Sequence, residues 1–455
     1  MTNSGPRTSG KRPNVLFLFA DDQRFDTINA LGNADVITPT LDALAERGTA
    51  LPHAHIMGST LGAVCVCSRA SLITGRGLFR AGELPLRGGP EALEGLAIWP
   101  EVMQHAGYAT FGTGKWHNAV EAYARGFTHG GNIFFGGMSN HLEVPIHDFN
   151  PAGEYPKEAS YTGGKFSSEL FSDAAVEFLS SYTGEEPFFM YVSFTAPHDP
   201  RMAPKEYADR YKPDALPVPE NFMPEHPFDN GEMRIRDEKL APWPRTPEIV
   251  REHLAAYYAM ITHLDAQMGR VLRTLEETGH GDDTIVIFAG DNGLAVGQHG
   301  LMGKQSLYEH SVRVPLIISG PGIPAGERRD GLCYLHDVFP TVCELAHIAV
   351  PESVDSRSLV PLITGSEGKL RDSVYGAYKG IHRMVRDDRH KLIEYSVKGT
   401  RTTQLFDLSA DPWEINNLAD DPEHAAHVAR LREELGKWQK AEDDPLADKW
   451  PSSTE

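Results

Sequence analysis

Two cysteines lie two residues apart in a short stretch whose residue types favour nucleophilic chemistry. The stretch reads Gly62-Ala-Val-Cys65-Val-Cys67-Ser-Arg69-Ala-Ser-Leu-Ile-Thr-Gly75-Arg76. Its apolar pair before Gly75 predicts a short helix that begins just after the cysteines, with Arg69 one turn beyond Cys65. A helix N-terminus and a guanidinium both favour an anion, so we expect a lowered pKa for the Cys65 thiol. A buried structural thiol is the alternative. The chain has no second Cys/His cluster at zinc spacing, which argues against zinc.

Oxygen-bearing side chains follow two apolar runs that predict strands buried on both faces. Residues 13–20 lead into Asp21 and Asp22, and a second run, starting at Thr284, leads into Asp291 and Asn292. Open α/β sheets bind ligands at the carboxyl ends of their strands, and a cation relieves the repulsion between adjacent carboxylates. Three carboxylates and an amide suit Ca²⁺ or Mg²⁺ better than zinc. An exposed turn is the alternative for the first pair.

A lysine and two histidines stand beside further predicted strands. Lys115 and His117 follow a short strand over residues 108–111, and on an extended chain both would point to one face. The glycines before Lys115 lack the spacing of a phosphate loop. His198 comes just after a buried strand over residues 187–194. From the residues alone, a solvated lysine and packed histidines are the alternative.

Length and charge limit the classes of protein to which the chain can belong. Its 455 residues suffice for one large α/β unit with an appendage. A formal net charge of −20 argues against nucleic acid and against anionic membranes as partners. An anionic substrate would therefore need a local pocket of cations. No apolar run is long enough to cross a bilayer, and residues 1–12 lack the core of a signal peptide, so we expect a cytoplasmic protein. Four cysteines do not make a disulfide framework at this size.

The pattern of the chain changes towards its C-terminal end. Residues 200–247 contain ten prolines and predict a long irregular segment rather than a domain. Short strands joined by charged turns come later, and a helix over about residues 424–440 closes the chain. We therefore predict a catalytic α/β domain over residues 1–365 and a C-terminal α+β subdomain over residues 366–455.

The stretch around Cys65 resembles the signature of the type I sulfatases, Cys-x-Pro-Ser-Arg followed by Leu-Thr-Gly-Arg. The resemblance extends from Arg12 to Leu418, in seven stretches that match in the same order. It implies the fold of the alkaline phosphatase superfamily, an α/β fold with a large mixed sheet between helices and a small C-terminal antiparallel sheet plus helix. One departure is Cys67, which stands where the family has Pro or Ala. The enzyme that matures these sulfatases uses this position to recognise its substrate.

This resemblance implies hydrolysis of sulfate monoesters through a formylglycine made from Cys65 by a formylglycine-generating enzyme. Its hydrate is the nucleophile. The implied catalytic residues are Cys65, Arg69, Lys115, His117, His198 and Lys304. The implied metal is Ca²⁺, with Mg²⁺ as the alternative, and its ligands would be Asp21, Asp22, Asp291, Asn292 and the modified Cys65.

Three loops resemble those of carbohydrate sulfatases, above all those that act on 2-O-sulfated uronic acids. The expected partner is therefore a sulfated small molecule or oligosaccharide. His141 is a candidate substrate contact, and Arg201 and Lys205 are candidates to pair with a substrate carboxylate.

Several other functions remain open from the sequence. A phosphonate or phosphodiester hydrolase, or an arylsulfatase, of the same superfamily would share most of these motifs. A metal-dependent alkaline phosphatase would need a second set of metal ligands, which is not evident. An inactive homologue that only binds sulfate esters would result if Cys65 is not converted.

Overall fold

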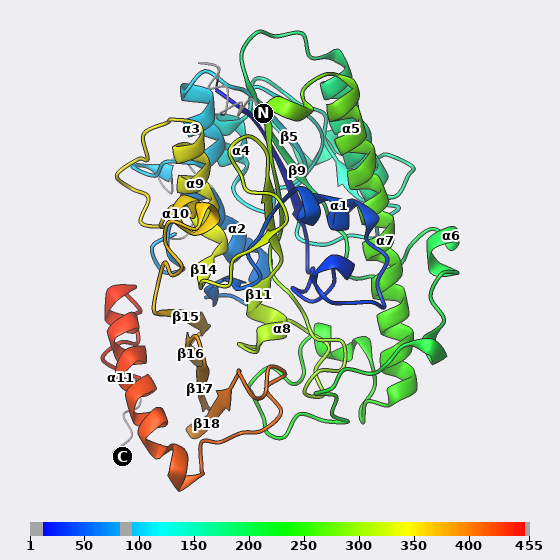
Figure 1. Ribbon diagram of the computed structural model, residues 1–455. Helices are drawn as coiled ribbons and strands as arrows, with labels where there is room; N and C mark the ends of the chain where they lie inside the picture. The colour runs from blue at the N-terminus through cyan, green and yellow to red at the C-terminus, as the bar shows by residue number, and fades with distance from the viewer. Residues whose placement is uncertain (1–11, 82–92, 451–455) are drawn as a thin grey trace, which may run out of the picture.

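A large mixed sheet forms the centre of the protein in a computed structural model that describes residues 12–81 and 93–450 (Figure 1). Within the described residues this sheet has eight strands, in the order β13 (Glu327–Arg328), β2 (Gly48–Ala50), β12 (Leu316–Ser319), β10 (Thr284–Gly290), β1 (Asn14–Ala20), β9 (Phe188–Ser193), β5 (Ala109–Lys115) and β6 (His129–Phe134). The run from β10 to β6 is parallel, whereas β12 is antiparallel to both β10 and β2. The predicted mixed sheet is therefore confirmed.

Helices cover both faces of the large sheet because its central strands are apolar throughout. Leu16 and Leu18 of β1 face one layer and Phe17 and Phe19 face the other, as the alternation of a strand requires. The first layer contains α1 (Pro39–Arg47), α5 (Ser167–Ser181) and α7 (Pro247–Glu277). The second contains α2 (Val64–Thr74), α3 (Trp99–His105) and α9 (Val338–Leu345). Figure 1 shows these two layers on opposite sides of the strands.

A smaller sheet occupies the C-terminal part of the chain. Its strands follow the order β18 (Thr400–Asp407), β17 (His390–Val397), β16 (His382–Asp387), β15 (Ser373–Tyr378) and β4 (Gly58–Ser59). The four C-terminal strands are antiparallel, as predicted, and α11 (Ala425–Ala441) lies beside them (Figure 1). The edge strand β4, however, comes from the segment just before α2 and pairs in parallel with β15. The division after residue 365 stays a prediction, and this sheet spans it.

The remaining elements are short. They are β3 (Ala54–His55), β11 (Arg313–Val314) and β14 (Cys333–Tyr334) in one sheet, β7 (Pro145–Ile146) and β8 (Tyr161–Thr162) in another, and α4 (Val120–Gly126), α6 (Lys205–Ala208), α8 (Glu309–Val312) and α10 (Val360–Thr364). Residues 200–247 contain only α6, two short 3-10 helices (Pro213–Ala215 and Asp237–Leu240) and isolated turns before α7 begins, which confirms the predicted irregular segment. Among the described residues, no helix is long and apolar enough to cross a membrane.

Candidate active site

Parallel pairing of β1 with β10 brings the predicted oxygen ligands together. Ala20 and Gly290 are partners at the ends of the two strands, so the residues that follow them lie at one edge of the sheet. The backbone N–H of Asp22 donates to Asp291 Oδ1 at 3.0 Å, and Asn292 Nδ2 donates to Asp22 Oδ1 at 2.7 Å. All four side chains are buried. The alternative of an exposed turn at Asp21 and Asp22 is therefore wrong.

Helix α2 carries Cys65 and Arg69 to the same edge. The helix begins at Val64, so both cysteines lie in its first turns, whereas the sequence had predicted a start just after them. Arg69 Nε donates to Asp291 Oδ2 at 2.8 Å, and its Nη1 donates to the carbonyl oxygen of Lys115 at 2.8 Å. The guanidinium thus contacts a carboxylate at the strand ends. The second thiol, of Cys67, is buried in the apolar cluster beneath the C-terminal sheet, and all four cysteines are free.

Two lysines bind the carboxylates that follow β1. Lys115, the last residue of β5, places Nζ 2.6 Å from Asp21 Oδ2. Lys304 places Nζ 2.5 Å from Asp22 Oδ1 and 3.2 Å from Cys65 Sγ. Both side chains are buried. The predicted alternative of a solvated Lys115 is therefore wrong.

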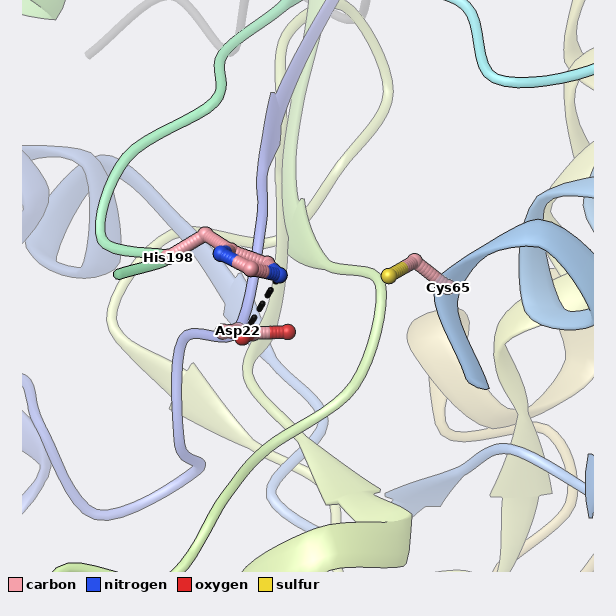
Figure 2. Close-up of side chains that lie close together, drawn as sticks. All are labelled: Asp22, Cys65 and His198. Atoms are coloured by element: carbon pink, nitrogen blue, oxygen red, sulfur yellow. Dashed lines mark ion pairs between the residues drawn. The ribbon is translucent and has the colours of Figure 1, made fainter. Parts of the chain in front are cut away.

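The two candidate histidines lie on the open side of this cluster. His198 Nε2 is 3.6 Å from Asp22 Oδ2, and Figure 2 shows Cys65 pointing from its helix towards this pair. His117 has a positive φ of 51°, so the chain turns after β5 instead of staying extended. Both histidines border one cavity of about 340 Å³ together with Cys65 and Lys304. Burial and nearby cations lower the pKa of His117 to about 2, which keeps the imidazole neutral.

One electrostatic expectation for the thiol is wrong. Burial raises the pKa of Cys65 to about 12, although Lys115 and Lys304 act in the opposite direction. The helix N-terminus and Arg69 do not overcome this desolvation, since Arg69 is already paired with Asp291. As an unmodified thiol, Cys65 is therefore a poor nucleophile at neutral pH.

The strand ends have the properties of a site for a divalent cation. Asp21 Oδ1 and Asn292 Oδ1 are buried and have no hydrogen-bond partner among the described residues. Exchanging the amide oxygen and nitrogen of Asn292 does not remove the unpaired acceptor, because Nδ2 in its present position donates to Asp22 and to the carbonyl oxygen of Gly293. Ligand atoms of Asp21, Cys65 and Asp291 lie within 4.8 Å of one another. Unpaired acceptors in an oxygen-rich cluster fit Ca²⁺ or Mg²⁺.

The charges of the cluster support the same conclusion. Each of its three carboxylates is paired with one buried cation: Asp21 with Lys115, Asp22 with Lys304 and Asp291 with Arg69. Burial and the neighbouring Asp291 nevertheless raise the pKa of Asp21 well above its usual value, because the local negative charge is poorly solvated. A divalent ion would stabilise the ionised carboxylates and would leave the pocket with the net positive charge that an anionic substrate needs.

Comparison with known proteins identifies the family. Residues 13–348 match the family model described as "Sulfatase", and residues 297–441 match one described as "N-sulphoglucosamine sulphohydrolase, C-terminal". The chain belongs to the sulfatase family. An arylsulfatase of Clostridium perfringens is 30% identical over 476 residues, which cover 96% of this chain and 96% of that protein. The protein is thus a sulfuric ester hydrolase.

Two solved structures show that the sulfatase has the fold that the resemblance implied. One is a complex of a protein with its substrate D-glucosamine-2-N,6-O-disulfate, at a TM-score of 0.80 and 23% identity over 97% of this chain and 100% of that one. The other is a 2-O GAG sulfatase, at a TM-score of 0.75 and 24% identity over 96% of this chain and 94% of that one.

The sequence did not single out Arg236 and Lys379 at the mouth of the sulfatase cavity, and Glu232 was included only as the last residue of a loop, residues 222–232, that resembles carbohydrate sulfatases. Glu232 and Arg236 come from the irregular segment before α7, and Lys379 comes from the turn between β15 and β16. Lys379 pairs with Glu232, and Arg236 forms a two-point ion pair with Asp199. Neither segment has a periodic pattern that would have indicated a site.

Three candidate substrate contacts do not line the sulfatase cavity. His141 is buried, and its Nε2 lies 2.8 Å from the carbonyl oxygen of His198, so it supports that residue. The guanidinium of Arg201 donates to His253 at 2.6 Å. Lys205 is 85% exposed and pairs with Asp209 one helical turn away. The expectations that His141 contacts the substrate and that Arg201 or Lys205 pairs with its carboxylate have no support at this cavity, which none of the three borders.

Proposed function

We propose that this sulfatase hydrolyses sulfate monoesters of carbohydrates through a formylglycine formed from Cys65, with Ca²⁺ bound by Asp21, Asp22, Asp291, Asn292 and residue 65. One observation carries the proposal. Side chains from five separate parts of the chain meet around the buried Cys65: the ends of β1, β5, β9 and β10 and the loop that holds Lys304. Structural ion pairs alone would not leave Asp21 Oδ1 and Asn292 Oδ1 buried and unpaired among the described residues, at strand ends where Asp21 also lies within 4.8 Å of the Cys65 sulfur.

The modified residue and the metal would supply chemistry that the twenty ordinary side chains lack. A formylglycine hydrate at residue 65 would supply a hydroxyl nucleophile that can revert to the aldehyde, and a cation held by Asp21, Asp22, Asp291 and Asn292 would supply positive charge for the sulfate oxygens. A converting enzyme must act during maturation, and Cys67 at the departure from the family signature is compatible with the fold, because its side chain packs away from the cavity.

The buried cations divide into two groups in this proposal. Lys115 and Arg69 do not border the cavity. They hold Asp21 and Asp291 in place and contribute positive charge to the site without contacting the cavity. Lys304 borders the cavity and contacts Cys65, so it can bind the sulfate and stabilise developing charge on the departing oxygen.

The two histidines suit proton transfer. His198 borders the cavity beside Lys304, and with that lysine it would assist departure of the alcohol. His117 is held neutral by burial and by the nearby Lys115, which allows it to accept a proton from the remaining hydroxyl of residue 65. Loss of that proton would expel sulfate and regenerate the aldehyde.

The mouth of the cavity supports a sugar with further charged groups as substrate. Arg236 and Lys379 border it and replace Arg201 and Lys205 as candidate partners of a carboxylate, such as that of a 2-O-sulfated uronate. The fold resemblance to a protein solved with a sulfated glucosamine and to a 2-O GAG sulfatase points to the same class.

The proposal can be tested by mass spectrometry and a substrate panel. The peptide that contains Cys65 should lose its sulfur at residue 65 and gain an aldehyde. The converted enzyme should release sulfate from sulfated uronates faster than phosphate or phosphonate from matching esters. Faster turnover of a phosphonate monoester would favour the alternative hydrolase, and an unmodified Cys65 in active protein would contradict the formylglycine mechanism.

A further inference from the structure

A second cavity, of about 560 Å³, lies away from the active site, and the two cavities share no lining residue. Its walls come from distant parts of the chain: residues 24–26 and 31–35 after β1, residues 217–220, the helix α7, Arg313 of β11, and Trp413 beyond β18. A volume of this size is within the range of small-molecule sites.

The walls of this second cavity are largely apolar and aromatic. Phe25 and Leu31 lie on one wall, Leu254 and Tyr258 project from α7, and Trp413 comes from the C-terminal region. Pro217 and Pro219 add further apolar surface that is held in a fixed backbone conformation. Such a lining suits an aromatic ring or a branched apolar group.

Arg24 brings a buried and incompletely bonded guanidinium to this cavity. The residue is only 2% exposed, and its Nε donates to Asp26 Oδ1. Its Nη1 is buried with no hydrogen-bond partner among the described residues. A buried unpaired donor costs about 1–3 kcal/mol, more when it is charged, so a ligand acceptor at this point would be strongly favoured.

A second guanidinium lies against the same space. Arg313 has a side chain that is 12% exposed, and its Cζ lies 4.0 Å from the centre of the Phe25 ring. Its Nε donates to the carbonyl oxygen of Pro52, and its nearest carboxylate, on Glu309, is 3.8 Å away. Asp26 is already bound by Arg24, and Arg328, Asp35 and Glu220 also line the cavity, so its positive and negative side chains balance and the unpaired guanidinium donor of Arg24 is what attracts an anion.

We propose that this cavity is a second ligand site of the sulfatase, and that it takes a small carboxylate with an aromatic or branched apolar body. The carboxylate accepts hydrogen bonds from Arg24 and Arg313, and the apolar body packs against Phe25, Leu254 and Tyr258. Guanidinium groups recognise carboxylates through paired N–H donors, which explains the preference for this anion.

The site is connected to the strand ends of the active site by a single side chain. The backbone N–H of Arg24 donates to the hydroxyl oxygen of Tyr257 at 3.0 Å, and that hydroxyl donates to the carbonyl oxygen of Asp22 at 2.7 Å. A ligand that fixes the position of the Arg24 side chain would therefore also restrain the segment that contains Asp22. It does so without entering the cavity around Cys65.

The test is isothermal titration calorimetry of the full chain with phenylacetate, and with its neutral analogue phenylacetamide as the comparison. Each titration is run with and without saturating inorganic sulfate, which occupies the active site. Arg24→Met removes the buried guanidinium. Ala34→Trp narrows the mouth from an exposed position of the lining and should leave the fold intact. Arg273→Met, on the exposed surface of α7, removes a guanidinium that does not border the cavity and serves as the matched control.

We expect one equivalent of phenylacetate to bind, at least tenfold more tightly than phenylacetamide. Affinity should fall at least tenfold in Arg24→Met and in Ala34→Trp and should stay unchanged in Arg273→Met. Three results would each overturn the proposal: no binding to the unaltered protein, undiminished binding to folded Ala34→Trp, or competition between phenylacetate and inorganic sulfate. None of these results depends on whether Cys65 is converted, so the proposed sulfatase mechanism stands or fails separately.

Discussion

Buried ion pairs determine how individual residues behave in the active site. Each of the three carboxylates at the strand ends already forms an ion pair with one arginine or lysine side chain. A metal ion would therefore bind to the oxygens that these ion pairs do not use. Asp21 Oδ1, and the amide oxygen of Asn292, have no hydrogen-bond partner within residues 12–81 and 93–450. Burial raises the pKa of the Cys65 thiol to about 12, which is consistent with the proposed conversion of this residue.

Replacement of Asn292 tests the metal site without breaking an ion pair. Its Oδ1 is the unpaired acceptor that would bind the cation, and the residue carries no charge. We expect Asn292→Ala to weaken Ca²⁺ binding at least about tenfold, in line with the loss of one ligand of a hard-cation site. Calorimetry on metal-stripped protein should give one site in the unaltered chain. Equal Ca²⁺ affinity in Asn292→Ala and in a distant control, Asn33→Ala, would contradict the assignment.

At the scale of elements, α2 is the helix that presents Cys65, and its C-terminal end is tightly enclosed. Gly75 ends the helix with φ +63°, and a Cβ there would lie 2.8 Å from Val354 and 2.9 Å from Phe339. Gly279, just past α7, has a similar φ of +80° but open space around it. Alanine substitutions at these two glycines therefore separate the cost of a left-handed backbone conformation from the cost of close packing.

We expect Gly279→Ala to lower the free energy of unfolding by about 1 kcal/mol, the usual cost of a left-handed conformation. Gly75→Ala should cost about 1–3 kcal/mol more, because side chains must also move in a packed core. Urea unfolding of both variants measures the difference. If the two variants are equally stable, the close packing around the end of α2 does not constrain this helix.

The sequence predicted the elements with strong local patterns and missed those that depend on distant contacts. β1, β9 and β10 were predictable because they are uninterrupted apolar runs. The strand order was not, since it depends on which segments pair across the fold. The two-residue strand β4 exists only because β15 lies beside it.

The same distinction holds for the active site. Lys115 and Lys304 were found through a family motif, and the structure places them at the strand ends. Lys379 was missed because it lies in a β-turn, and Glu232 was covered only by the resemblance of its loop because it lies in an irregular segment. Their proximity arises only when the C-terminal sheet packs against the residues before α7.

On the scale of the whole molecule, buried neutral histidines accumulate where the C-terminal sheet meets the irregular segment. His382 Nε2 lies 2.6 Å from the carbonyl oxygen of Asn230, and His226 lies 3.1 Å from the hydroxyl of Tyr308. Burial lowers the pKa of His226 to about 4 and those of His299 and His382 to about 3. These values fix the direction in which acid changes stability.

Acid should destabilise the protein well before its carboxylates titrate. An unfolded histidine binds a proton below its ordinary pKa of 6.5, whereas these three stay neutral in the folded state until the pH reaches about 3–4. Their contribution to stability is thus fully present above pH 6.5 and is lost as the pH falls. Each should lower the free energy of unfolding by about 2 kcal/mol between pH 7 and pH 5.

Denaturant unfolding at several pH values measures this dependence. The variant His382→Gln should show a pH slope that is smaller by about one proton over the same interval. A slope that is the same in this variant as in the unaltered protein would show that His382 is protonated in the folded state as readily as in the unfolded one.

The central claim is that residue 65, and not residue 67, carries out the hydrolysis. Cys65 borders the cavity and contacts Lys304, whereas Cys67 packs in the apolar cluster beneath the C-terminal sheet. The most direct test is the rate of sulfate release by Cys65→Ala and Cys67→Ala, produced in one host that supplies a formylglycine-generating enzyme. Cys65→Ala should lose activity by at least about a thousandfold, as expected on removal of a nucleophile, and Cys67→Ala should retain it. Retained turnover in Cys65→Ala together with its loss in Cys67→Ala would contradict the assignment.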